Sequence, residues 1–169
     1  MKKIEMFFDY FCPYCLKGHE QLLEFSRDKP GLEIIWHPCE IYKLPGNYSG
    51  TKHSDICIQG MFFVSDNGLD LWRYHKKMYD LIHNDRVNVE NTDVFTKAFE
   101  GFFDAEDFRQ ALTSGKYKSR VEEANHFAFQ QSGIHVVPTY RADGGCLRDR
   151  QEFFKMGPSS TSYSGENRV

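Results

Sequence analysis

The stretch IEMFFDYFCPYCLKGHEQLLEF, residues 4–25, carries the pattern that predicts the fold of this chain. Residues 4–8 form a short run that is mainly apolar and aromatic, which is typical of a buried strand. Residues 16–27 contain no proline and several large apolar side chains, so they predict a helix. Pro13 lies one residue into that helix, where its missing N–H costs nothing and its fixed φ suits the first turn. Cys12 is therefore expected at or just before the N-terminus of the helix.

The position of Cys12 predicts an acidic thiol. The pKa of a free cysteine is about 8.5, and a helix N-terminus with a Cys-x-x-Cys partner lowers it to roughly 3.5–7.5. The helix dipole and the unpaired N–H groups of the first turn stabilise the thiolate. Cys15, one turn further along, is expected to be less exposed and close enough to form a disulfide with Cys12. The spacing predicts Cys12 as the attacking thiolate and Cys15 as the resolving thiol.

Other uses of a Cys-x-x-Cys pair fit this sequence less well. A structural zinc site needs a second ligand pair, and His19, Cys39 and Cys57 do not have the required spacing. Haem attachment needs a histidine after the second cysteine, where this chain has Leu16. A purely structural disulfide remains an alternative. Redox chemistry that needs no metal and no organic cofactor is favoured, with His19 an ordinary exposed helix residue and Cys39 a buried small side chain.

The composition is that of an ordinary globular protein. The 169 residues suffice for one domain, or for one domain with an insertion, and 27% of them are charged and 40% hydrophobic. A net charge of −3 gives no reason to expect nucleic acid as a partner. The sequence shows neither a signal-peptide pattern nor an apolar run of about 18 residues, so no membrane association is expected. The odd count of five cysteines agrees with a cytoplasmic protein.

The chain after the first helix predicts an interrupted α/β unit. Residues 32–36 are β-branched and aromatic, and they predict a second strand parallel to the first. Residues 43–50 are turn material. Helical patterns then continue to about residue 132, including an amphipathic stretch at 71–82. The segment 51–116 is therefore predicted to be a helical insertion, and the next helix returns the chain to the sheet.

The boundaries of the later helices are marked by capping residues. Thr92 and Asp104 are expected to begin two of them, and Ser114-Gly115 to end the second. The returning helix is predicted to be longer and to end at Gly133.

Residues 134–140 predict a return to the sheet beside an irregularity. Val136 and Val137 have strand character, and Pro138 interrupts it at once. A proline within a strand is tolerated at an edge or at an irregularity. The sequence leaves open whether the Val137–Pro138 bond is cis. Asp143-Gly144 then predicts a hairpin turn.

The order of these motifs is similar to that of the DsbA family of the thioredoxin superfamily, and most of all to its cytosolic FrnE-like branch. The likeness covers about residues 4–140. It implies the fold class α/β, a thioredoxin-like fold with an inserted all-helical domain. Residues 1–50 and 117–157 would form the thioredoxin-like domain, and residues 51–116 the helical insertion domain.

The same resemblance implies the site. Cys12 matches the nucleophile of the family and Cys15 its resolving cysteine. Val137 and Pro138 match the loop that faces the cysteine pair and pairs with an extended substrate by strand addition. Pro13 and Tyr14 lie between the cysteines, where they are expected to contact the substrate. Tyr14 is also expected to tune the redox potential of the pair. No metal and no cofactor is implied.

Two carboxylates precede the cysteine pair. Glu5 resembles the acidic residue that lies below the disulfide in the family, where it would relay protons from Cys15 and burial would raise its pKa. The alternative for Glu5 is a strand residue that simply faces solvent. Asp9 is expected to be a turn residue that orients the loop.

Three functions compete at this point. The first is thiol–disulfide oxidoreductase or isomerase chemistry on a protein or a low-molecular-weight thiol or disulfide. The second follows from a further resemblance, to kappa-class glutathione transferases and hydroxychromene-carboxylate isomerases, which bind glutathione. Those proteins usually have serine where this chain has Cys12, which counts against them. The third is a binding module that holds unfolded chains in an aromatic groove.

The sequence departs from the DsbA pattern after Tyr140. Residues 145–150 predict only a weak strand, and residues 158–169, rich in serine and glycine, predict a disordered tail. A shortened C-terminus would leave part of the sheet surface open. A second copy of the chain could cover it, so a homodimer is one expectation.

Overall fold

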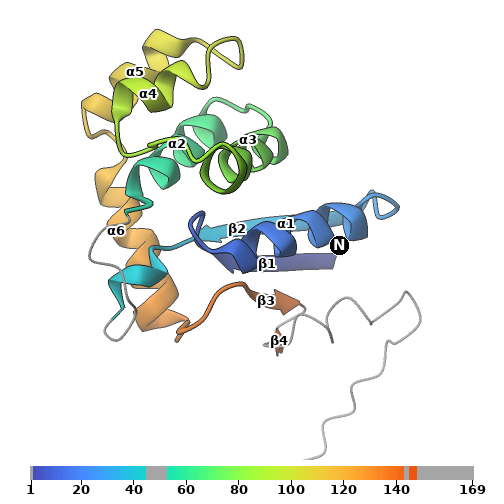
Figure 1. Ribbon diagram of the computed structural model, residues 1–169. Coiled ribbons are helices and arrows are strands. Elements are labelled where there is room, and N and C mark those ends of the chain that lie inside the picture. Colours follow the sequence, from blue (N-terminus) through green and yellow to red (C-terminus); the bar gives the residue numbers. More distant parts are fainter. Residues whose placement is uncertain (1, 45–52, 143–144, 148–169) are drawn as a thin grey trace, which may run out of the picture.

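The computed structural model describes residues 2–44, 53–142 and 145–147 (Figure 1). The strands are β1 (Lys2–Phe8), β2 (Leu32–Pro38), β3 (Thr139–Ala142) and β4 (Gly145–Leu147). The helices are α1 (Pro13–Ser26), α2 (Asp55–Asp66), α3 (Leu71–Tyr79), α4 (Thr92–Lys97), α5 (Ala105–Thr113) and α6 (Lys118–His126). Three short helical segments are η1 (Ile41–Lys43), η2 (Asp80–Asn84) and η3 (Phe127–Gln131).

The strands form one mixed sheet with the order β2-β1-β3-β4. β1 and β2 are parallel, with Lys2 opposite Leu32 and Phe8 opposite Pro38. β3 is antiparallel to β1, and β4 is antiparallel to β3. The predicted strand–helix–strand unit is therefore confirmed, and it brings the end of β1 and the start of α1 to the same edge of the sheet.

Helices cover both faces of the sheet, as the alternation along β1 shows. Met6 and Phe7 are both fully buried and, as neighbours on a strand, point to opposite faces. Met6 approaches Gly18 of α1. The ring of Phe7 stacks on that of Phe127 in η3, with centroids 6.0 Å apart. One face of the sheet is therefore covered by α1, which follows Cys12, and the other face by η3.

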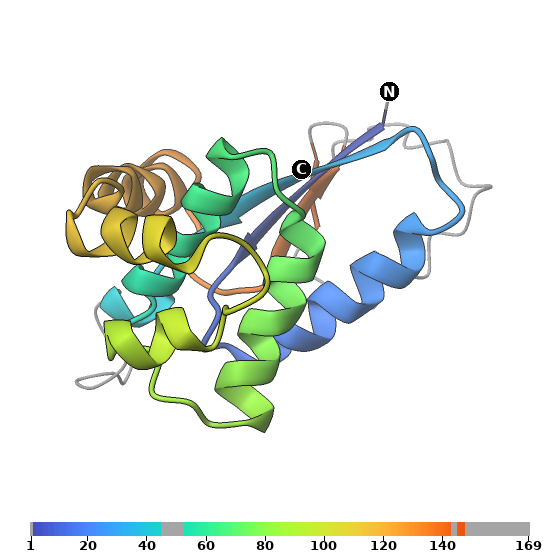
Figure 2. The ribbon, with the colours of Figure 1, turned by 90° about the horizontal axis from the view of Figure 1, so that it is seen from above.

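Helices α2 to α5 gather on one side of the sheet, opposite β3 and β4 (Figure 1), and Figure 2 shows this layer from above, lying over the sheet. The segment 57–64 of α2 is buried without a break. A helix surrounded by other elements needs no polar face, so its sequence shows little helical periodicity. This burial explains why the periodic pattern points to α3 more clearly than to α2.

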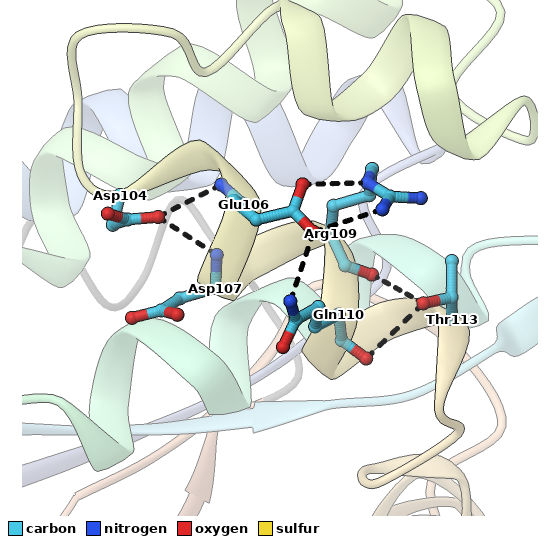
Figure 3. Close-up of polar contacts among 6 residues, drawn as sticks. All are labelled: Asp104, Glu106, Asp107, Arg109, Gln110 and Thr113. Carbon is cyan, nitrogen blue, oxygen red and sulfur yellow. Dashed lines mark hydrogen bonds and ion pairs between the residues drawn. The ribbon is translucent and has the colours of Figure 1, made fainter.

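The N-terminus of α5 shows how polar side chains set the helix boundaries (Figure 3). The Asp104 carboxylate accepts hydrogen bonds from the N–H groups of Glu106 at 3.0 Å and Asp107 at 2.9 Å. Glu106 in turn accepts from Arg109 and from Gln110. The predicted cap at Asp104 is confirmed, because these bonds satisfy donors that the helix itself leaves unpaired. The predicted cap at Thr92 is wrong, because Asn91 is the N-cap of α4 and Thr92 its first helical residue.

Two of the predicted helices finish in a wider turn. The amphipathic stretch 71–82 is α3 followed by η2, a wider π-helical turn, and the helix leading to Gly133 is α6 followed by η3, a turn of the same kind. Gly133, with a φ of +63°, ends the second one, and the Ile134 N–H donates to the Ala128 carbonyl at 2.9 Å.

The strand predicted from Val136 begins later, at Thr139. Pro138 has no N–H to donate to a ladder, and the Val137 carbonyl accepts from a side chain instead. The prediction that residues 136–137 form a strand is therefore wrong. The predicted turn at Asp143-Gly144 and the tail at 158–169 lie outside the described residues.

The domain boundaries inferred from the sequence stay a prediction. Within the described part of the chain, no helix combines the length and the apolar character that a bilayer-crossing segment requires.

Candidate active site

Cys12 occupies the N-cap position of α1, at the junction that the sequence predicted. Its backbone is extended, with φ −84° and ψ 114°, and Pro13 begins the helix directly after it. The Cys12 N–H donates to the Asp9 carbonyl at 3.1 Å, which closes the loop between β1 and α1. Only 7% of Cys12 is exposed, so the residue is largely buried at the helix N-terminus.

The surroundings of Cys12 favour its thiolate. A hydrogen bond from the Cys15 thiol lowers the pKa of Cys12 to about 7, and the backbone N–H groups of Cys15 and Tyr14 contribute in the same direction. Partial burial and the charge of Asp9 oppose this shift. Bonds to the ionised sulfur therefore outweigh its desolvation. Near neutral pH a large fraction of Cys12 is ready to act as a nucleophile.

Cys15 has the opposite character. It is fully buried in the first turn of α1, and this burial raises the pKa of its thiol well above the ordinary value. The hydrogen bond that Cys15 donates to Cys12 adds to the shift, since donation requires the proton. Both cysteines are free thiols in this structure. The pair consists of one reactive sulfur and one protected sulfur.

The loop before β3 faces this pair. The Sγ atom of Cys12 lies 3.5 Å from the carbonyl oxygen of Val137, and the Val137–Pro138 peptide bond is cis. Val136 of this loop is 59% exposed, and Tyr14, two residues after Cys12, is 64% exposed. The structure thus brings together four of the predicted substrate-contact positions around one sulfur: Pro13, Tyr14, Val137 and Pro138.

Asp9 is the carboxylate that the structure places within electrostatic reach of the sulfurs. It is fully buried and accepts hydrogen bonds from the N–H groups of Phe11 at 3.0 Å and Ile41 at 2.9 Å. Burial raises its pKa to about 6 despite these bonds. The predicted turn role is confirmed. Its charge also raises the pKa of both Cys12 and Cys15, an effect that sequence reasoning missed.

Glu5 has a different partner from the one that the family resemblance implies. Its Oε2 lies 3.0 Å from Nε2 of His37. Glu5 shares the sheet face of Phe7, whereas α1 and Cys15 cover the face of Met6. The proton relay from Cys15 to Glu5 stays a prediction, and no direct contact supports it among the described residues.

His19 is buried, so the expectation of an exposed helix residue is wrong. It is only 2% exposed and packs against Trp72, His75 and Tyr79 of α3, with ring centroids 5.1 to 5.6 Å apart. Burial lowers its pKa to about 4, which keeps the ring neutral. The helical insertion covers this face of α1, and a helix pattern read in isolation cannot reveal that contact.

Cys39 and Cys57 do not join the pair into a metal site. Cys39 and Cys57 are free and fully buried, and burial raises the pKa of each thiol. This confirms Cys39 as a buried small side chain. Across residues 2–44, 53–142 and 145–147, no three histidine, cysteine, aspartate or glutamate side chains are grouped as metal ligands would be.

Comparison with known proteins finds a family match for the first part of the chain and one similar sequence. Residues 3–63 match the family described as the DSBA-like thioredoxin domain. The uncharacterized protein YwbO of Bacillus subtilis (strain 168) is 22% identical in an alignment 171 positions long, which covers 81% of this chain and 84% of that protein.

Three solved structures show the same fold. BdbD from Bacillus subtilis in its oxidised form has a TM-score of 0.72 and 16% identity, over 91% of this chain and 85% of BdbD. A 2-hydroxychromene-2-carboxylate isomerase has a TM-score of 0.74 and 14% identity, over 90% and 91% of the two chains. DsbA of Pseudomonas aeruginosa has a TM-score of 0.62 and 19% identity, over 85% and 70%.

These comparisons and the sheet with its helical insert confirm the α/β, thioredoxin-like fold expected from the sequence. In sequence, residues 3–63 match the DSBA-like thioredoxin domain, and over most of its length the chain has the fold of BdbD.

Proposed function

We propose that this protein is a thiol–disulfide oxidoreductase in which Cys12 is the nucleophile and Cys15 the resolving thiol. The observation that carries this proposal is the contrast between the two sulfurs. Cys12 keeps 7% exposure and its pKa is lowered to about 7, whereas Cys15 is completely buried and its pKa is raised. A labile pair needs one thiolate that attacks and one thiol that stays protonated until the second step.

The reaction proceeds in two exchanges. The Cys12 thiolate attacks one sulfur of a substrate disulfide, a mixed disulfide forms, and the other substrate sulfur leaves as a thiolate. Cys15 then loses its proton and attacks the Cys12 sulfur, which releases the second substrate thiolate and leaves a Cys12–Cys15 disulfide. The substrate gains two electrons and the protein loses two, and the reverse sequence oxidises a substrate dithiol.

Asp9 is suited to receive the proton that Cys15 loses. With a pKa of about 6, the carboxylate is mostly ionised at neutral pH, and its charge already acts on both sulfurs. A proton moving onto Asp9 removes that charge when the second sulfur must ionise. The Val137 carbonyl, 3.5 Å from the Cys12 sulfur, marks where an extended substrate segment would pair with the loop.

Serine variants test the assignment. Cys12→Ser should abolish exchange with a disulfide substrate, because the sulfur with the lowered pKa is lost. Cys15→Ser should accumulate the mixed disulfide, detectable as a mass increase that a reductant reverses. Cys57→Ala, which removes a buried thiol of α2, is the control and should react like the unchanged protein. Equal reactivity of Cys12→Ser and the unchanged protein would refute the proposal.

A glutathione-dependent isomerase or transferase is the second candidate. The likeness in fold to the 2-hydroxychromene-2-carboxylate isomerase, at a TM-score of 0.74, favours its consideration. The free dithiol at Cys12 and Cys15 favours exchange chemistry instead. Calorimetric titration of the reduced protein with glutathione distinguishes the two. Tight binding of the thiol without any exchange supports the isomerase type, and exchange with glutathione disulfide supports the oxidoreductase.

A further inference from the structure

A pocket of about 620 Å³ lies beside the cysteine pair. Its apolar wall consists of Phe11, Pro13, Tyr42, Ile82 and Val87, so both chain neighbours of Cys12 line it. Its polar wall consists of His83 and Arg86, from the segment that follows α3. Pockets of this size are typical of small-molecule sites, in which a few polar groups fix the orientation of a mostly apolar ligand.

The two walls are held together by a bond near the active site. The carbonyl of Tyr10 can only accept, so Nε2 of His83, 2.8 Å away, carries the hydrogen. This bond joins η2 to the loop that precedes Cys12. The position of the polar wall relative to the reactive sulfur is therefore set by the fold.

Arg86 has a backbone conformation that glycine normally occupies. Its φ is +54°, and among the described residues it is the only one other than glycine with a positive φ. The turn is closed by the Val87 N–H, which donates to the Leu81 carbonyl at 2.8 Å, as in a helix C-terminus that favours glycine. The chain uses glycine at its other positive-φ positions: Gly68, Gly101, Gly115 and Gly133. An arginine at such a place points to a role for its side chain.

The guanidinium of Arg86 is available for a ligand. The residue is exposed, and it makes no hydrogen bond or ion pair with another residue in the ranges that the structure describes. Asp85 precedes it in the chain but does not line the pocket. A planar cation with five donors at the rim of an apolar pocket is suited to a carboxylate.

We infer that this pocket, with Arg86 as its specificity-determining residue, selects low-molecular-weight disulfides that carry a carboxylate on an apolar body. The inference rests on the proposed function, since the bound disulfide would be attacked by Cys12. The apolar part of the substrate lies against Phe11, Pro13 and Tyr42, its carboxylate meets Arg86, and one of its sulfurs faces the thiolate. The exchange itself is the two-step reaction described above.

Single-turnover kinetics of the fully reduced protein tests the inference. The probes are dithiobis(nitrobenzoic acid), an aromatic disulfide with two carboxylates, and its dicarboxamide. The ratio of their rate constants is compared between proteins, so that the intrinsic reactivity of each disulfide cancels. Arg86→Gly removes the charge and suits the positive φ, so this variant should fold at least as well as the unchanged protein. Arg86→Lys retains the charge. Arg109→Gln, which removes an arginine from the exposed face of α5, is the matched control.

Arg86→Gly should lower the acid-to-amide ratio about five- to tenfold, which is the range of a partly screened charge-assisted contact. Arg86→Lys should keep most of the acid-to-amide ratio, and Arg109→Gln should keep all of it. Added salt should reduce the ratio in the unchanged protein. An Arg86→Gly ratio within about twofold of the original, or an equal loss in Arg86→Lys, overturns the inference while exchange itself continues. If neither probe reacts at Cys12, the proposed function fails, and this inference with it.

Discussion

At the scale of the residue, the two sulfurs of one short motif differ because only one of them is at the helix entrance. Cys12 receives hydrogen bonds from the Cys15 thiol and from two backbone N–H groups, and these outweigh its partial burial. Cys15 is enclosed by the core, and it donates a hydrogen bond to Cys12 rather than accepting one. The Cys15 thiol is the largest of the influences that lower the pKa of Cys12, so the acidity of Cys12 depends on Cys15.

Replacing Cys15 should therefore change the acidity of Cys12. In Cys15→Ala the donor is lost, and the pKa of Cys12 should rise from about 7 toward the ordinary value. In Cys15→Ser a hydroxyl remains to donate, so the rise should be smaller. The rate of Cys12 alkylation as a function of pH reports the pKa directly. An identical titration midpoint in both variants and the unchanged protein would exclude this coupling.

At the scale of the element, the fit of α1 against the sheet brings the proline loop to the cysteine pair. Gly18 lies where a side chain would meet the Tyr140 hydroxyl, Met6 and Pro138. The absence of a Cβ atom at this position lets the helix approach β3 and the loop before it. The helix itself does not require glycine here, since alanine has the higher helix propensity by about 1 kcal/mol.

Gly18→Ala should consequently destabilise the protein. The contact with the Tyr140 hydroxyl and the two atoms at 3.3 Å, on Met6 and Pro138, forces a shift that costs roughly 1–3 kcal/mol and outweighs the gain in helix propensity. Urea unfolding measures the difference. Gly31→Ala is the control, because nothing lies within 4 Å of its added methyl group. If Gly18→Ala is as stable as Gly31→Ala, the packing argument is wrong.

At the scale of the whole molecule, a cluster of aromatic rings joins the cysteine-bearing helix to the helical insertion. His19 of α1 and His75 of α3 lie with ring centroids 5.6 Å apart, and Trp36 of β2 contacts both. Burial lowers the pKa of His19 to about 4 and that of His75 well below the usual value. Both rings are neutral in the folded protein, so lowering the pH is expected to destabilise the packing between α1 and α3.

The expected pH dependence follows from the sign of the shift. The unfolded chain binds a proton at His19 below about pH 6.5 and the folded one only near pH 4, so stability is lost as the pH falls through this window. The loss from His19 amounts to about 3 kcal/mol at pH 4. Asp9 acts in the opposite direction, since its raised pKa of about 6 favours the folded state as acid is added.

The variant His19→Phe isolates the histidine from this opposing effect. The difference in unfolding free energy between His19→Phe and the unchanged protein should shift by about 3 kcal/mol in favour of the variant between pH 7 and pH 4. Urea unfolding at a series of pH values provides the measurement. A difference that stays constant with pH would mean that His19 is protonated equally in both states.

Much of this architecture follows from patterns a few residues long. The strand before the cysteine pair, the proline that begins α1 and the cap at Asp104 act through neighbouring backbone groups, and so they were predictable. The strand expected at Val136 failed because Pro138 and the bond to Cys12 replace ladder contacts. The burial of His19 was missed because the helix that covers it is distant in the sequence.

The sequence by itself determined that a cysteine pair begins a helix behind a buried strand, since this arrangement depends on contacts between chain neighbours. Only the tertiary structure decided what surrounds the pair. It brought the Val137 carbonyl to Cys12, selected Asp9 rather than Glu5 as the carboxylate within reach of the sulfurs, and placed Arg86 on the wall of the adjacent pocket. These relations depend on which surfaces are buried against each other, and burial is a property of the packed molecule.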